Sequence, residues 1–384
     1  MNENITAPNT RLLSLDVFRG LTVAAMILVN NPGDWGNIYA PLKHAEWHGC
    51  TPTDLIFPFF LFIVGVSIAF SLGTKKKNGV PDKAIIISII KRSAILFLLG
   101  IILALIPDIF IDPLKALSTI RIPGVLQRIA LVFLVCAILF YKTGIKTQII
   151  LFAFILIVYW VLMTLVPVPD GTAPNLEKET NLGAWLDRTL LTESHLWKLS
   201  KTWDPEGILS TLPAIASGIS GVLTGLWLRR KDLRANKKIY FMLISGFISC
   251  ISAFLWDNYF PMNKALWTSS YVLFTSGLAL IMLALLYWII DIRQVKSFTK
   301  PFLVYGVNAI TVFFLSSIMA KLFNFIKVVD ASGADVSLKT WLFQSFFVPN
   351  FSPLNASLAW ALCFVFFWLA ILWWMYNQKI FIKV

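Results

Sequence analysis

Two of the chain's three histidines lie in a polar segment between two long apolar runs, and this segment holds the side chains best suited to chemistry. His44 and His48 fall between Asn30 and Asp54, with Glu46 beside them. An imidazole changes its protonation near neutral pH, so a histidine next to a bilayer is a candidate for proton transfer or covalent catalysis. The competing interpretation is an interfacial loop whose polar residues only face water.

Asn30 and His44 are fourteen positions apart, which is enough chain for the loop to fold back over the end of the preceding helix. An asparagine in this position commonly ends a helix. Directed at the loop instead, its amide can donate a hydrogen bond to a developing oxyanion, which is worth roughly 3–4 kcal/mol in acyl transfer. His44 can act as a general base, worth about 10²–10⁴-fold in rate, or as a nucleophile that forms an acyl-imidazole.

Two groups of carboxylates have the spacing of helix starts. Thr51 suits an N-cap, Pro52 the first helical position, and Asp54 completes a box-like cap. The same carboxylate of Asp54 can also orient a histidine. Asp204 and Glu206, with a proline between them, repeat this pattern before another apolar run, where Asp204 is expected to cap the helix.

A few polar side chains lie inside or beside the apolar runs. Asp16 and Arg19 are three residues apart, so they can pair on one helix face. Arg128 follows Gln127 about one turn into an apolar run and needs an anionic partner, either a carboxylate or a ligand phosphate. The remaining polar points are Asn263, Lys264, Trp267 and Asn308. For Lys264 and Trp267 we favour anchoring at the membrane interface.

The composition indicates that membrane helices position these residues. The chain is 58% hydrophobic and only 14% charged, whereas soluble domains are about 25% charged. A membrane span needs about 20 mostly apolar residues. We therefore predict an all-α integral membrane protein, a polytopic bundle of about ten transmembrane helices in a single domain over residues 1–384. The predicted spans are 12–30, 55–72, 88–106, 123–141, 148–166, 207–228, 239–256, 269–290, 301–322 and 356–376.

The distribution of charge predicts the orientation of this bundle. With a cytoplasmic N-terminus, most of the 33 basic residues but few of the 20 acidic ones fall at the inner ends of the spans. The positive-inside rule then places both termini in the cytoplasm. The net charge of +13 is thus a topology signal rather than a nucleic-acid footprint. The predicted outer loops are 31–54, 107–122, 167–206, 257–268 and 323–355, the third with a short amphipathic piece near Leu182–Leu191.

Seven motifs, in order across nearly the whole chain, resemble the heparan-α-glucosaminide N-acetyltransferase family. They are Arg11-Leu-Leu-Ser-Leu-Asp-Val-Phe-Arg-Gly20, Lys43-His-Ala-Glu-Trp47, Thr53-Asp-Leu-Ile-Phe-Pro58, Arg121-Ile-Pro-Gly-Val-Leu-Gln-Arg128, Asp204-Pro-Glu-Gly-Ile-Leu209, Pro261-Met-Asn-Lys-Ala-Leu-Trp267 and Gly306-Val-Asn308. The resemblance implies transfer of acetyl from cytoplasmic acetyl-CoA, across the membrane, to the amine of a terminal glucosamine. By position, His44 corresponds to the family's catalytic histidine and Asn30 to its active-site asparagine.

We assign the remaining polar residues with this resemblance in view. Asp54 joins His44 and Asn30 in the catalytic group. No metal is expected, because a thioester is already an activated acyl donor and the four cysteines are widely separated. Acetyl-CoA is expected to bind at Arg11, Arg19, Gln127 and Arg128, and the sugar at Asp204, Glu206, Asn263 and Trp267.

Two alternatives remain open from the sequence. One is an O-acetyltransferase that acts on a glycan hydroxyl. The other is an amino-sugar transporter with the histidine loop as its gate, which predicts inverted repeats and broken helices that the sequence does not show. The expected partners are acetyl-CoA, an amino sugar or glycan, and the bilayer, without nucleic acid. A bacterial inner membrane with the acceptor site facing the periplasm is the expected location, and a homodimer is one alternative for the oligomeric state.

Overall fold

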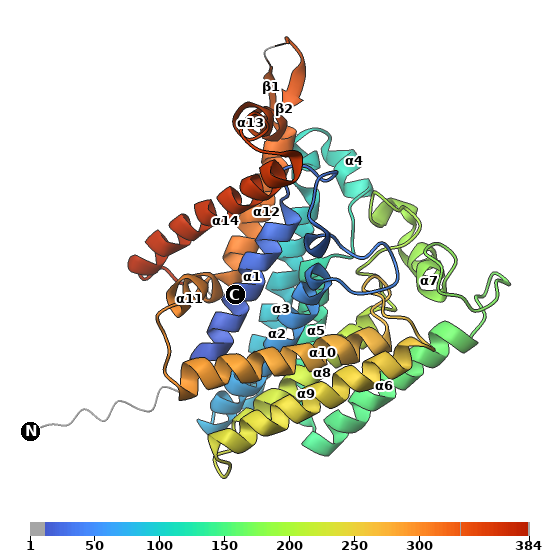
Figure 1. Cartoon of the computed structure of the whole chain (residues 1–384). Helices are drawn as coiled ribbons and strands as arrows, with labels where there is room; N and C mark the ends of the chain where they lie inside the picture. Colours follow the sequence, from blue (N-terminus) through green and yellow to red (C-terminus); the bar gives the residue numbers. More distant parts are fainter. Residues whose placement is uncertain (1–11, 331, 383–384) are drawn as a thin grey trace, which may run out of the picture.

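The computed structural model describes residues 12–330 and 332–382, and almost all of their regular secondary structure is helical (Figure 1). Nine of the described helices are long and apolar enough to cross a membrane, or ten spans if a bent pair is counted as one. The predicted all-α polytopic fold is confirmed. The nine are α1 (Leu13–Asn30), α2 (Ile56–Lys77), α3 (Asp82–Leu105), α5 (Val125–Lys142), α6 (Ile145–Leu165), α8 (Thr211–Leu228), α9 (Ala235–Asp257), α10 (Ser269–Leu286) and α14 (Pro353–Asn377).

The predicted ninth span, 301–322, contains a sharp bend. α11 (Thr299–Val307) and α12 (Ala309–Phe325) meet at an angle of 80°. Asn308 stands at the bend with non-helical backbone angles, and its amide bonds the C-terminal tail at Ile380 O (3.1 Å) and Ile382 N (2.9 Å). The apolar run continues across the bend, so hydropathy did not reveal the broken helix that the sequence was expected to lack.

Close helix contacts hold the centre of the bundle together. A Cβ on Gly65 of α2 would lie 2.1 Å from the carbonyl oxygen of Gly218 on α8. A Cβ on Gly20 of α1 would lie 1.7 Å from the carbonyl oxygen of Phe302 on α11. Small residues let membrane helices approach to backbone contact, which is the main source of packing energy where lipid is as apolar as the side chains.

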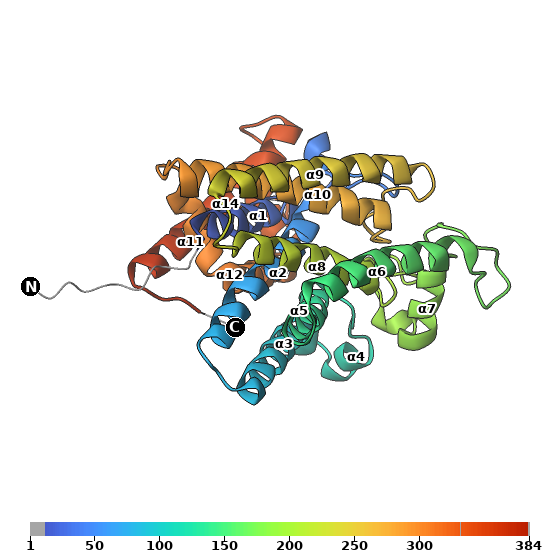
Figure 2. The ribbon, with the colours of Figure 1, turned by 90° about the horizontal axis from the view of Figure 1, so that it is seen from below.

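Figures 1 and 2 show α9 and α10 side by side along one face, with α11 and α14 at one side of the molecule and α6 and α7 at the other. α7 (Leu182–Leu191) confirms the predicted amphipathic piece, and Asn181 caps it by accepting from Ala184 N at 2.9 Å. The sixth span begins at Thr211, four residues later than predicted. The other short elements are α4 (Pro113–Ser118), α13 (Leu338–Phe346), the antiparallel strands β1 (Lys327–Val329) and β2 (Asp335–Ser337), a π-helical turn (Tyr287–Ile292) that continues α10, and 3₁₀ turns at Ala40–Leu42, Pro52–Leu55, Asp108–Phe110 and Glu193–His195.

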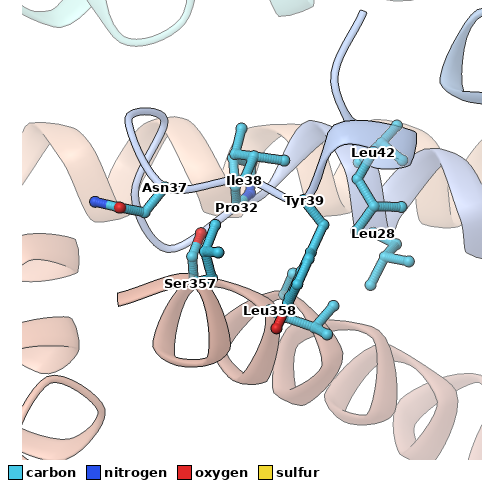
Figure 3. Close-up of a pocket in the computed structure, with 11 residues that line it drawn as sticks. Leu28, Pro32, Asn37, Ile38, Tyr39, Leu42, Ser357 and Leu358 are labelled. Carbon is cyan, nitrogen blue, oxygen red and sulfur yellow. The ribbon is translucent and has the colours of Figure 1, made fainter. Parts of the chain in front are cut away.

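The loop that leads from α1 to the two histidines packs against the start of α14. Figure 3 shows the side chains of Pro32 and Tyr39 against this helix. The hydroxyl of Ser357 donates to Asp34 O at 3.0 Å and accepts from Asp34 N at 3.1 Å, and the Tyr39 hydroxyl donates to Asn355 Oδ1 at 2.6 Å. These bonds fix the path of the loop before it reaches the candidate site.

Candidate active site

A cavity of about 610 Å³ lies where α1 ends and α2 begins. The last turn of α1, the start of α2, the loop between α9 and α10, and α12 each contribute to its wall. The cavity brings together three residues predicted to be catalytic, Asn30, His44 and Asp54, and one predicted to bind the sugar, Glu206. Its other polar lining includes Arg121, Lys178 and Lys264.

Asp54 orients His44 and caps the following helix at the same time. Its Oδ2 accepts from Thr51 N, Thr51 Oγ1 and Ala45 N, each at 3.0 Å, which completes the predicted capping box. Its Oδ1 lies 2.6 Å from His44 Nδ1. A carboxylate only accepts hydrogen bonds, so Nδ1 carries a proton in this bond, and in the neutral imidazole Nε2 then keeps its lone pair. Among the described residues, His48 makes only an edge contact with the Trp47 ring, and it does not line the cavity.

Lys264 lies against this pair, although sequence reasoning favoured an interfacial anchor for it. Its Nζ is 3.0 Å from His44 Nδ1, 3.3 Å from His44 Nε2 and 3.6 Å from Asp54 Oδ1. Burial lowers the pKa of the Lys264 amine, and the negative charge of Asp54 opposes that shift. The side chain reaches into the cavity, so Lys264 belongs to the candidate site, and its role as an interfacial anchor stays a prediction.

Asn30 is free of the helix-ending role that its sequence position suggested. The neighbouring Asn31 takes that role, since its Nδ2 donates to Ile27 O at 2.8 Å. The side chain of Asn30 is exposed, lines the cavity and makes no hydrogen bond to any other described residue. Its amide can therefore donate to a group bound in the cavity.

An ion-pair cluster forms another part of the wall. Arg121 binds Asp204 through Nε (2.8 Å) and Nη2 (2.5 Å), and the same Nη2 reaches Glu206 Oε2 at 2.6 Å. Burial lowers the pKa of Arg121, but the two carboxylates outweigh it and leave that pKa raised. Asp204 caps only a turn, by accepting from Glu206 N at 2.9 Å, so the prediction that it starts α8 is wrong. The carboxylate of Asp204 instead binds the guanidinium of Arg121.

Three tryptophans form an aromatic side of the cavity. Trp47 and Trp203 meet edge to face with ring centroids 5.2 Å apart, and Trp203 meets Trp197 in the same way at 5.5 Å. The indole N–H of Trp47 donates to Leu176 O at 2.9 Å, and Lys178 Nζ lies 5.6 Å from its ring centroid. The long loop between α6 and α8 therefore supplies most of this side.

Arg128 lies behind the cavity and has neutral partners. Its Nη2 donates to Gly207 O at 3.0 Å and to Ser210 Oγ at 2.5 Å, and its guanidinium sits 5.1 Å from the Trp267 ring centroid. Its Nε and Nη1 have no partner among the described residues. No carboxylate of the described residues is hydrogen-bonded to Arg128, although one was expected. The nearby Asp204 is bound by Arg121 instead.

The other predicted site residues are buried or lie elsewhere. Trp267 is 1% exposed, with its indole N–H donated to Ser217 Oγ at 3.1 Å, so its assignment as an interface anchor is wrong. Asn263 is also fully buried, and Gln127 lies beside Gly100 and Gly124 in an adjoining cavity of about 410 Å³. The roles of these three in ligand binding stay predictions.

Arg19 is held within the bundle, well away from the cavity. Its Nη1 pairs with Asp16 Oδ1 at 3.1 Å as the spacing predicted, and its Nη2 donates to Ser67 Oγ at 2.8 Å. Eleven residues of α1 separate it from Asn30, or about 16 Å along the axis. Arg11 lies outside the described residues, and the role of both arginines in binding CoA stays a prediction.

Sequence reasoning missed Lys264, Arg121 and the tryptophans as members of one site. Arg121 stood only within a motif, and Lys264 was expected only as an interfacial anchor. Their partners are 83 and 220 residues away in the chain. One signal was present for Arg121, since two acidic residues as close as Asp204 and Glu206 need a cation when they are buried.

The family model for the catalytic region of heparan-alpha-glucosaminide N-acetyltransferase matches residues 11–196. The Homo sapiens heparan-alpha-glucosaminide N-acetyltransferase is 30% identical over 370 residues, covering 84% of this chain and 55% of the human protein. The Mus musculus protein of the same name is 29% identical over 363 residues, covering 82% and 54%. The chain thus spans about half the length of the curated relatives it matches. The matched segment contains Asn30, His44 and Asp54, and the chain is a relative of the heparan-alpha-glucosaminide N-acetyltransferase family.

Proposed function

We propose that this chain transfers acetyl from acetyl-CoA to the amine of a glucosamine-type sugar, with His44 as general base. The observation that carries the proposal is the 2.6 Å bond from His44 Nδ1 to Asp54, which leaves Nε2 for a proton in a cavity that Asn30 also lines. The family relationship supports the choice of acetyl as the transferred group and of an amino sugar as its acceptor.

In the proposed reaction the sugar amine attacks the carbonyl carbon of the thioester. His44 Nε2 takes a proton from the attacking nitrogen, while Asp54 holds the imidazole in position and stabilises its positive charge. The amide of Asn30 donates to the oxyanion of the tetrahedral intermediate. When that intermediate collapses, the C–S bond breaks and the proton on His44 passes to the departing thiolate. The products are the N-acetyl sugar and CoA.

The aromatic side of the cavity supports a sugar as the acceptor. A sugar ring has apolar C–H faces and polar hydroxyl edges, and Trp47, Trp197 and Trp203 offer flat apolar surface beside the carboxylate of Glu206. Mostly apolar walls with a few placed polar groups are typical of small-molecule sites.

We place the cavity at the outer face of the membrane. α2 begins beside His44 and ends at Lys75–Lys77, and another basic run, Arg229–Lys231, follows the end of α8 that lies away from the cavity. Positive charge at the opposite ends of these helices supports a cytoplasmic location for those ends. Acetyl-CoA would then enter from the basic end, and the 18 residues of α1 correspond to about 27 Å between the two faces.

The test uses purified chain in lipid vesicles with [acetyl-¹⁴C]acetyl-CoA and glucosamine. We expect label on N-acetylglucosamine, and a loss of about 10²–10⁴-fold in His44→Ala. His48→Ala is the matched control, because His48 lies in the same loop without a carboxylate partner, and it should keep the rate. Transfer at the wild-type rate in His44→Ala would refute the assignment. A hydroxylamine-sensitive acetyl group trapped on His44 by rapid quenching would identify it as a covalent carrier instead of a base.

Sidedness has its own test in inside-out vesicles. Acetyl-CoA supplied only outside should label glucosamine trapped inside, because the CoA side and the acceptor side are opposite. Label that appears only on sugar added to the same side as acetyl-CoA would contradict transmembrane transfer.

A further inference from the structure

Lys264 is fixed rigidly, although it lies in a loop. Asn263 Oδ1 accepts from Leu266 N at 2.9 Å, Asn263 N donates to Thr268 Oγ1 at 3.0 Å, and Trp267 N donates to Lys264 O at 3.2 Å. Trp267 is fully buried despite a φ of 54°, a left-handed conformation that costs energy for an aromatic residue. The backbone of Lys264 is therefore held in place, and its side chain extends into the cavity.

The ε-amine of Lys264 occupies the position that an acceptor amine must reach. It lies 3.3 Å from His44 Nε2, the nitrogen proposed as the base, and 3.0 Å from Nδ1. Contacts to a catalytic base are often this long in the absence of substrate. It also lines the cavity that holds Asn30. A primary amine on a side chain and the primary amine of glucosamine have the same nucleophilic group.

We propose that Lys264 is an internal acceptor, acetylated by acetyl-CoA when no sugar amine occupies the cavity. This inference rests on the proposed function, because it uses the same donor and the same base. It adds a modification site and a consequence, which is that acetyl-CoA without an acceptor inactivates the protein.

The reaction balances without another reactant. Lys264 loses one proton to water from its ammonium form, and the neutral amine attacks the thioester carbonyl. His44 accepts the second proton from nitrogen, the C–N bond forms, the C–S bond breaks, and that proton leaves on the thiol of CoA. The net change is an ammonium and acetyl-CoA converted to an N-acetyl-lysine, CoA and a proton. A buried lysine with a lowered pKa is a common nucleophile in enzymes, which supports the first step.

Acetylation would remove a positive charge from the site. The ammonium lies 3.6 Å from Asp54 Oδ1 and shares that carboxylate with His44. An N-acetyl group at this point also takes up space that the sugar amine needs. Turnover should therefore fall as Lys264 becomes acetylated, and glucosamine should protect by competing for the acetyl group.

The experiment incubates the purified full chain with [acetyl-¹⁴C]acetyl-CoA alone and locates label by peptide mass spectrometry. We expect one acetyl group on Lys264, suppressed by glucosamine, absent in Lys264→Arg and reduced about 10²-fold in rate in His44→Ala. Lys43→Arg is the matched control: Lys43 is exposed next to His44 and does not line the cavity, so this variant should keep the label on Lys264.

Sugar transfer is measured on the same preparations. Transfer to glucosamine with no label on Lys264 would overturn this inference and leave the proposed function standing. Equal labelling in wild type and His44→Ala would also overturn it, because the acetylation would then be uncatalysed. If neither sugar nor lysine is labelled, both the proposed function and this inference fail.

Discussion

Replacing Asp54 with asparagine changes one oxygen into an amide nitrogen at nearly constant volume, and the structure predicts which way the new group will turn. Three donors, from Thr51 and Ala45, converge on Oδ2 at 3.0 Å. They will hold the asparagine's carbonyl oxygen on their side, so its NH₂ group faces His44 Nδ1. The Nδ1–H of His44 and this NH₂ group are both hydrogen-bond donors, so they cannot bond to each other. The imidazole must then move its proton to Nε2, and this removes the lone pair that acts as the base.

The size of the effect follows from what is lost. The 2.6 Å bond between His44 and Asp54 is charge-assisted, and such bonds contribute about 1.5–3 kcal/mol, or about 10–10²-fold in rate at 1.36 kcal/mol per factor of ten. Loss of the base itself costs about 10²–10⁴-fold. We therefore expect kcat for Asp54→Asn to fall by about 10²–10⁴-fold.

Initial rates of label transfer at saturating acetyl-CoA and glucosamine measure this loss. Asp34→Asn is the matched control, because Asp34 lies in the same loop and accepts from Gly36 N (2.9 Å) and Asn37 Nδ2 (2.6 Å) away from the cavity. It should keep its turnover. Measurements of acetyl-CoA binding and of thermal unfolding will test whether Asp54→Asn is folded. A folded Asp54→Asn variant with turnover within threefold of wild type would refute the base mechanism.

Two further predictions concern stability. Burial, with a contribution from the nearby Asp204, raises the pKa of Asp187 to about 7 from an ordinary 3.8. Between those pH values the folded protein holds one proton more than the unfolded protein. Its free energy of unfolding should therefore fall as pH rises through that window. Thermal unfolding against pH should show this slope flattened in Asp187→Asn, and parallel curves for the two proteins would contradict it. Gly65→Ala should destabilise by about 1–3 kcal/mol because the new methyl meets Gly218 O, whereas Gly144→Ala, with open space around it, should not; equal melting temperatures for both would refute the contact.

The parts of the site that sequence analysis predicted are local in the chain. Thr51 and Asp54 form the predicted capping box, and His44 reaches Asp54 across only ten residues. Helix capping has fixed offsets, so the residue types and spacing were enough. Hydropathy likewise predicted the membrane helices, because a span requires a long apolar run whatever its neighbours are.

The parts that sequence analysis missed depend on tertiary contacts. Nothing in the loop at Lys264 indicates that its side chain meets His44, which is 220 residues away. At the bend, Asn308 bonds to the C-terminal tail, and the hydropathy of the sequence does not indicate such hydrogen bonds. Asn30 and Asn31 are the same residue type in adjacent positions, and only the structure shows which one closes the helix.

The ion pairs of the cavity also bear on which acceptor it suits. Arg121 is already bound by Asp204 and Glu206, so that part of the wall does not present a free guanidinium to an anionic group. It presents carboxylate oxygen, since Glu206 Oε1 has no hydrogen-bond partner among the described residues. Carboxylates accept from hydroxyl and ammonium groups, and glucosamine carries both. An acceptor held by Glu206 as an ammonium would form an ion pair with the carboxylate, and it would lose one proton to water before it attacks. A hydroxyl acceptor would form only a hydrogen bond that the charge of the carboxylate assists. The arrangement of charges therefore favours N-acetylation over O-acetylation in this cavity.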